Sequence, residues 1–142
     1  MRRSFYRLCP LLITVALAAS ACDESVDPSA LDPTPIDPEA VVETFTGALN
    51  KNGAVTHTFN TTGSGTVIAT LVSVAPDATV ALSLSVGTWS GLTCQVVLAN
   101  DGAVAGLSIT GTGSAAGTFC VRLSDVGNIT DTITYEIRVS HP

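Results

Sequence analysis

The sequence predicts an all-β protein, a single antiparallel two-sheet β-sandwich of jelly-roll-like form with eight or nine short strands. From Thr44 onward, Val, Ile, Thr and Leu dominate, and Gly, Asn and Asp interrupt them at the close spacing typical of sandwiches. No segment shows the apolar periodicity of a helix. The part of the chain behind the N-terminal segments is long enough for one modest hydrophobic core.

The strands are expected at residues 44–49, 55–60, 66–74, 79–86, 94–99, 104–110, 118–124 and 132–140. Residues 79–86 alternate most regularly, so Val80, Leu82, Leu84 and Val86 should point inward and the serines between them outward. Asn100-Asp101-Gly102 is a strong turn signal. Residues 88–93 and 111–117 are expected to be loops.

The N-terminus is typical of an export signal. Residues 1–7 are basic, residues 8–19 are apolar, and Ala19-Ser20-Ala21 precedes Cys22. Ser20, Ala21 and Cys22 resemble the bacterial lipobox, with Ala19 where leucine is usual. The resemblance implies that residues 1–21 are removed and that Cys22 receives the lipid. The alternative is an ordinary secretory signal that leaves Cys22 as an idle thiol.

The next segment, residues 22–42, is predicted to be an acidic, Pro-rich linker. Four of the seven prolines lie here, and the pattern apolar-Asp-Pro occurs three times, ending at Pro28, Pro33 and Pro38. Repulsion between the acids and the restricted residues before proline favour an extended, disordered spacer. A Pro-rich recognition motif is the alternative interpretation of this repeat.

The charge of the chain excludes nucleic acid as a partner. After removal of residues 1–21, Lys51, Arg122 and Arg138 face all twelve acids, a formal charge of −9. Binding to nucleic acid needs clustered basic residues that neutralise phosphates. The expected contact with the membrane is therefore the lipid at Cys22.

Cys94 and Cys120 are expected to form a disulfide, because both lie on predicted strands and an exported domain is in an oxidising compartment. Cys120 alternates with inward residues, so the bridge should lie off the main core face. Two free thiols or a metal-binding pair are the alternatives.

Residues 43–142 resemble the bacterial pre-peptidase C-terminal family, small β-sandwiches of secreted and envelope proteins. The resemblance is carried by five segments: Thr46-Gly47-Ala48-Leu49, Val55-Thr56-His57-Thr58-Phe59, Gly65-Thr66-Val67-Ile68-Ala69-Thr70-Leu71, Ala116-Gly117-Thr118-Phe119-Cys120-Val121-Arg122-Leu123 and Thr134-Tyr135-Glu136-Ile137-Arg138-Val139. It implies an accessory, targeting or binding role without catalysis. The acidic run that the family often has after its third strand is absent, so no calcium site is carried over.

No catalytic residue, metal site or cofactor is predicted. His57 alternates with Val55 and Phe59 and is expected to be partly buried and hydrogen-bonded, whereas His141 is expected at a frayed terminus. Ser90 with His57 and an Asp forms a nominal triad that lacks the context of a nucleophile. The turn aspartates leave a loop calcium site as an alternative: Asp77, Asp101, Asp125 and Asp131.

Trp89 is the candidate ligand contact. It lies in Gly87-Thr88-Trp89-Ser90-Gly91, where an exposed indole would stack on a sugar or anchor a protein, and a buried one would cover the end of the sandwich. The sequence thus favours a non-catalytic, membrane-anchored lipoprotein of the bacterial envelope that binds a protein or polysaccharide. A structural or assembly subunit without a specific ligand and a secreted hydrolase are the alternatives.

Overall fold

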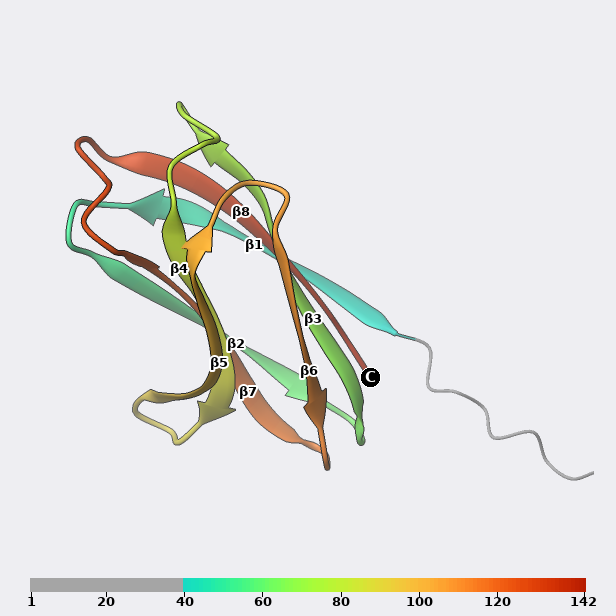
Figure 1. Cartoon of the computed structure of the whole chain (residues 1–142). Coiled ribbons are helices and arrows are strands. Elements are labelled where there is room, and N and C mark those ends of the chain that lie inside the picture. The colour runs from blue at the N-terminus through green and yellow to red at the C-terminus, as the bar shows by residue number, and fades with distance from the viewer. Residues whose placement is uncertain (1–39) are drawn as a thin grey trace, which may run out of the picture. The chain divides into compact units, whose positions relative to one another are not determined.

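The computed structural model describes residues 40–142, which fold into eight strands without a helix among them (Figure 1). The strands are β1 (Val41–Leu49), β2 (Ala54–Thr61), β3 (Gly65–Ala75), β4 (Leu82–Trp89), β5 (Cys94–Ala103), β6 (Ser108–Gly113), β7 (Gly117–Asp125) and β8 (Ile133–His141). The predicted signal peptide, the lipidation of Cys22 and the linker up to residue 39 lie outside the described residues.

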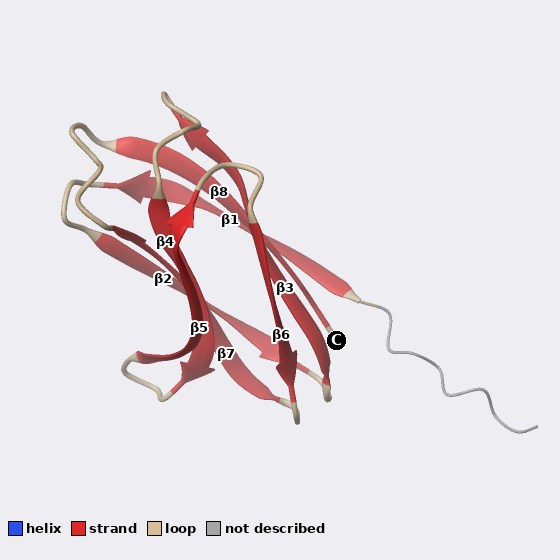
Figure 2. Cartoon of the chain, viewed as in Figure 1, coloured by secondary structure: helices blue, strands red, loops and turns tan. Residues whose placement is uncertain are grey.

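The strands form two antiparallel sheets of four, in the orders β1-β8-β3-β6 and β2-β7-β4-β5 (Figure 2). Successive strands alternate between the sheets, except where β4 is followed by its neighbour β5. This is the strand order of a jelly roll, so the predicted sandwich is confirmed. β5 and β6 are edge strands of different sheets.

The core lies between the sheets and is almost entirely aliphatic. β8 follows the predicted alternation closely, with Ile133, Tyr135, Ile137 and Val139 all buried. The other core residues are Leu49, Phe59, Val67, Ala69, Leu71, Val74, Leu82, Leu84, Val86, Ala103, Ile109, Val121, Leu123 and Ile129. The inward positions predicted for β4 and β7 are therefore correct where these strands pair with each other.

β4 differs from its predicted form at both ends and on its outer face. It begins at Leu82 and not at residue 79, and it continues to Trp89. Ser83 and Ser85 are buried, although alternation predicts exposure. The Ser83 hydroxyl donates to Asp101 Oδ1 at 2.6 Å, and the Ser85 hydroxyl donates to the Arg122 carbonyl at 3.3 Å.

β5 bends over the outer face of β4 near Gly87. A Cβ placed on Gly87 would lie 2.0 Å from the Gln95 carbonyl oxygen and 2.9 Å from Val96 Cα. The pairing of the two strands shifts between Val86 and Gly87, so β5 carries a bulge here. Glycine at position 87 lets the β5 backbone lie directly against β4.

The turn predicted at residues 100–102 is wrong, because these residues belong to β5. The Asn100 side chain accepts the Gly102 amide at 2.9 Å, and a second register shift lies opposite, between Leu82 and Leu84. The turn residues therefore form a bulge, and the chain reverses after residue 103, where Gly106 has φ 92°. As a result β6 starts at Ser108 and extends into the loop predicted at residues 111–117.

Candidate binding surface at the disulfide-linked hairpin

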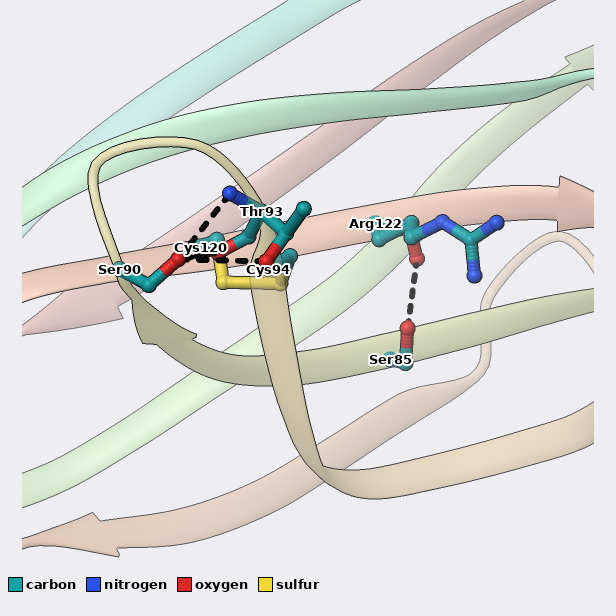
Figure 3. The surroundings of a disulfide bond; sticks show 6 residues. All are labelled: Ser85, Ser90, Thr93, Cys94, Cys120 and Arg122. Atoms are coloured by element: carbon teal, nitrogen blue, oxygen red, sulfur yellow. Dashed lines mark hydrogen bonds between the residues drawn. A yellow bond between two sulfur atoms is a disulfide. The ribbon is translucent and has the colours of Figure 1, made fainter.

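The Cys94–Cys120 disulfide is present, with a Cα–Cα distance of 5.8 Å. It joins the first residue of β5 to β7, two strands that β4 separates in the sheet. Cys120 pairs with Gly87 on the outer face, away from the core cluster, as predicted. The bridge therefore fastens the bent start of β5 to the outer face of its own sheet (Figure 3).

The hairpin tip between β4 and β5 is closed by its own hydrogen bonds. The Ser90 amide donates to the Thr93 carbonyl at 3.1 Å. The Thr93 amide donates to the Ser90 hydroxyl at 3.1 Å (Figure 3). Gly91 takes the positive φ of 93° that the tight tip requires. Leu92 is consequently held outward and is 88% exposed. The tip therefore holds this apolar side chain in solvent, next to the disulfide at Cys94.

A depression of about 410 Å³ lies beside this tip. Its lining combines one aromatic ring, one aliphatic side chain, one guanidinium-bearing side chain and two hydroxyl groups, and consists of Thr56, Trp89, Leu92, Thr93, Cys94 and Arg122. We call it the hairpin depression.

Trp89 lines the hairpin depression and is half-buried. It is the last residue of β4 and not a loop residue, and it pairs with Cys94, one end of the disulfide. The side chain is therefore only partly exposed to solvent, and it lies beside the end of the disulfide at Cys94.

Arg122 supplies the only positive charge at the hairpin depression. Its main-chain carbonyl accepts the Ser85 hydroxyl, and its side chain extends along the outer face of the sheet (Figure 3). Within residues 40–142, ion pairs are found at Arg138–Glu136 and His141–Glu43 but not at Arg122. Its guanidinium is thus free to donate hydrogen bonds to an anionic or hydroxyl-bearing ligand.

The two histidines lie on the inner side of the molecule, away from the hairpin depression. His57 and the Tyr135 hydroxyl share a hydrogen bond of 2.8 Å, and Phe45 stacks on the imidazole at 4.8 Å, which confirms the partly buried, satisfied histidine. Burial lowers the pKa of His57 and raises the pKa of Tyr135. Ser90 lies in the tip of the β4–β5 hairpin and bonds to Thr93, whereas His57 bonds to Tyr135, so the structure does not bring the nominal triad together.

The prediction for His141 is wrong. Its side chain is 1% exposed, its Nε2 lies 3.0 Å from Glu43 Oε1, and its ring lies 5.1 Å from that of Phe59. The last residues of β8 pair with the first of β1, so His141 is enclosed by the sandwich and not frayed.

Aspartates in the turns accept hydrogen bonds from nearby backbone amides. Asp125 accepts amides of Asn52, Gly127, Asn128 and Ile129, and these hydrogen bonds, that from Asn52 foremost, lower its pKa. Within the described residues, no three His, Cys, Asp or Glu side chains have an arrangement that would hold a metal ion.

Asp77 has a similar local role. Its Oδ1 accepts both the hydroxyl and the amide of Thr79, and the hydroxyl contact is the main reason why the pKa of Asp77 is lowered. The carboxylates of Asp77 and Asp125 therefore stabilise turns through their hydrogen bonds.

No protein-family model and no curated protein matches this chain. In the part of the chain that the structure describes, there is no helix of the length and hydropathy needed to cross a membrane. Two residues of the hairpin depression, Leu92 and Arg122, were not singled out from sequence. Leu92 carried a usable signal, because an apolar residue next to Gly91 in a tight turn has no core to enter.

Proposed function

We propose that this protein is a non-catalytic lipoprotein of the bacterial cell envelope, whose β-sandwich binds a protein or polysaccharide partner through the hairpin depression. The observation that carries the proposal is the presentation of Trp89 and Leu92 at a disulfide-linked tip beside an unpaired Arg122. Trp and Arg are among the residue types that contribute most to binding energy at protein interfaces.

Rigidity supports this function. A binding surface loses less conformational entropy when its side chains are held before the ligand arrives. The hydrogen bonds between Ser90 and Thr93 and the adjacent disulfide provide this preorganisation at the hairpin depression. The lining groups suit stacking, apolar contact and hydrogen bonding to an incoming ligand.

Attachment to the membrane is the second part of the proposal, and it rests on the sequence around Cys22. Two or three acyl chains on this residue would give a stable anchor, and the acidic Pro-rich segment would hold the sandwich away from the bilayer. Metabolic labelling with a fatty-acid analogue tests this part. Label should enter the wild-type chain and not Cys22→Ala; equal labelling of the two chains contradicts the anchor.

Binding can be followed with the intrinsic fluorescence of Trp89, because it is the only tryptophan in the chain. The full chain is titrated with a panel of envelope polysaccharides, and a benzophenone amino acid in place of Leu92 captures contacting envelope proteins on cells. We expect a saturable fluorescence change or one dominant adduct. Leu92→Asn should weaken polysaccharide binding, and Trp89→Ala should reduce adduct formation.

The matched control is Val126→Asn, which changes a 44% exposed apolar residue in a different turn. Binding should be unchanged in this variant. If Leu92→Asn and Val126→Asn bind a ligand equally well, or if Trp89 fluorescence and position 92 detect nothing, the hairpin depression is not the binding surface.

A structural or assembly subunit is the second candidate function. The observation that favours it is the apolar run Val96-Val97-Leu98 on the edge strand β5, which is exposed at 46%, 78% and 36%. This run lines a different surface from the hairpin depression.

A further inference from the structure

The Trp89 and Arg122 side chains line the hairpin depression from two different places on its sheet. Arg122 pairs with Ser85, four residues before Trp89 on β4, so the main chains of Trp89 and Arg122 are about 13 Å apart along the strands. The Arg122 side chain points away from the hairpin tip that holds Ser90 and Thr93 (Figure 3). A ligand that meets both the indole and the guanidinium must therefore be extended, as a polymer is.

The charge at the hairpin depression is opposite to the net charge of the domain. Residues 40–142 carry six acids and three bases. Arg122 is the only charged residue that lines the depression, and among the described residues no carboxylate lies within ion-pair distance of it. A guanidinium presents a planar fork of donors that fits a carboxylate in a bidentate manner. The complementary ligand is therefore one that carries carboxylates.

The position of the depression in the sheet favours an acidic sugar over an acidic peptide. β7 lies between β2 and β4, and β4 lies between β7 and β5, so the main-chain groups of both strands are used within the sheet. A bound peptide would find few main-chain partners here for its own amides and carbonyls. A sugar ring needs only side chains, because its C–H face stacks on an indole and its hydroxyls bond to groups such as those of Thr56 and Thr93.

We propose that the hairpin depression binds a polysaccharide built from uronic acid units. One sugar ring stacks on Trp89, and Arg122 holds the carboxylate of a unit further along the same polymer. This inference rests on the proposed function and deepens it, because it names the chemical class of the ligand and the residue that selects it.

The test compares two polymers that differ only in charge. The full chain is titrated with polygalacturonate and with the same polymer after complete methyl esterification, and the fluorescence of Trp89 is recorded. We expect a saturable change with polygalacturonate. The methyl ester should bind about tenfold more weakly, the low end of the range for loss of a hydrogen bond to a charged group. Trigalacturonate should bind, and the monomer should bind about tenfold more weakly because it cannot reach both side chains.

Substitutions at Arg122 test which residue selects the acid. Arg122→Gln should weaken the binding of polygalacturonate about tenfold and remove the preference for the acid over the ester. Arg122→Lys keeps the charge without the planar fork, so its affinity should lie between those of the wild type and Arg122→Gln. It also carries the test if Arg122→Gln does not fold, which thermal unfolding shows.

The matched control is Arg138→Gln, which removes the same charge from β8 in the other sheet. The Arg138 side chain is 53% exposed and paired with Glu136 at 3.4 Å. This variant should bind polygalacturonate as the wild type does. Polyglutamate, a polymer with carboxylates on a peptide backbone, serves as the control ligand and should bind more weakly than polygalacturonate.

Four outcomes overturn the inference. They are equal binding of the acid and its ester, an unchanged preference for the acid in folded Arg122→Gln or Arg122→Lys, an equal loss of binding in Arg138→Gln, and tighter binding of polyglutamate than of polygalacturonate. Ester binding that Leu92→Asn weakens, or a protein adduct at position 92 without polygalacturonate binding, overturns the uronic acid ligand and leaves the proposed function standing. The absence of any fluorescence change and of any adduct overturns both.

Discussion

Gly87→Ala should destabilise the domain more than any other glycine-to-alanine change in a strand. The new Cβ would lie 2.0 Å from the Gln95 carbonyl oxygen and 2.6 Å from its carbonyl carbon. Both are backbone atoms, so no side chain can turn away, and β5 must move off β4. Overpacking of this kind costs about 1–3 kcal/mol, and the disulfide at Cys94 restricts the movement that would relieve it.

Gly111→Ala is the matched control for this change. Its Cβ meets Leu98 at 3.9 Å, an ordinary contact, and Gly111 has no positive φ. It should stabilise the domain by about 0.4–1 kcal/mol, because alanine restricts the unfolded chain. Gly87→Ala and Gly111→Ala should therefore differ by about 1.4–4 kcal/mol in the free energy of unfolding.

Urea unfolding followed by circular dichroism measures this difference without relying on Trp89, which lies close to Gly87. A difference of about 2 kcal/mol corresponds to a shift of roughly 8–16 °C in Tm for a domain of this size. If Gly87→Ala unfolds within about 0.5 kcal/mol of the wild type, β5 does not lie against β4 as described.

Three further perturbations have defined outcomes. Replacing both Cys94 and Cys120 with alanine should lower the free energy of unfolding by ~3.5 kcal/mol in urea, the chain-entropy value for a separation of 26 residues; a loss below about 1 kcal/mol would contradict it. Burial lowers the pKa of His57, so the unfolded chain binds a proton at this residue more readily than the folded chain, and the free energy of unfolding should fall as the pH drops below about 6.5. His57→Gln should lose this part of the pH dependence. An unchanged slope of the unfolding free energy against pH in this variant refutes the assignment. Asp125→Ala frees four amides in two turns and should lower Tm more than Asp131→Ala, as thermal unfolding would show; equal Tm values would mean that the Asp125 contacts add nothing.

Alternation predicted the elements that have one face in the core and one in solvent. β7 and β8 follow this alternation. Each strand lies between two neighbours in its sheet, so its inward side chains pack in the core and its outward side chains lie on the outer face of the sheet. The disulfide between Cys94 and Cys120 could also be predicted from sequence, because the oxidising compartment and the small number of cysteines left few alternatives.

The β4–β5 hairpin could not be predicted, because its form depends on contacts between distant residues. Asn100-Asp101-Gly102 has the composition of a turn, yet Asp101 accepts the Ser83 hydroxyl across the hairpin and the segment becomes a bulge. The burial of Ser83 has the same origin. Local preference for a turn was outweighed by cross-strand hydrogen bonding.

The candidate site was predicted only in part for a related reason. Trp89 stood out by its residue type, but its exposure depends on how the disulfide bends β5 over the sheet. Arg122 occupies an ordinary outward position on β7, and only the structure shows that no acid among the described residues pairs with it.

The pairing of β1 with β8 also determines how the domain would respond to force. Val41 lies opposite His141, and the two strands run antiparallel through nine paired residues to Leu49 and Ile133. Force applied between residues 41 and 141, which lie at the same end of the strand pair, would load its hydrogen bonds one after another. A pull on residue 41 against residue 133 would load them together in shear. The same strand pair is therefore mechanically weak in one direction of loading and strong in the other.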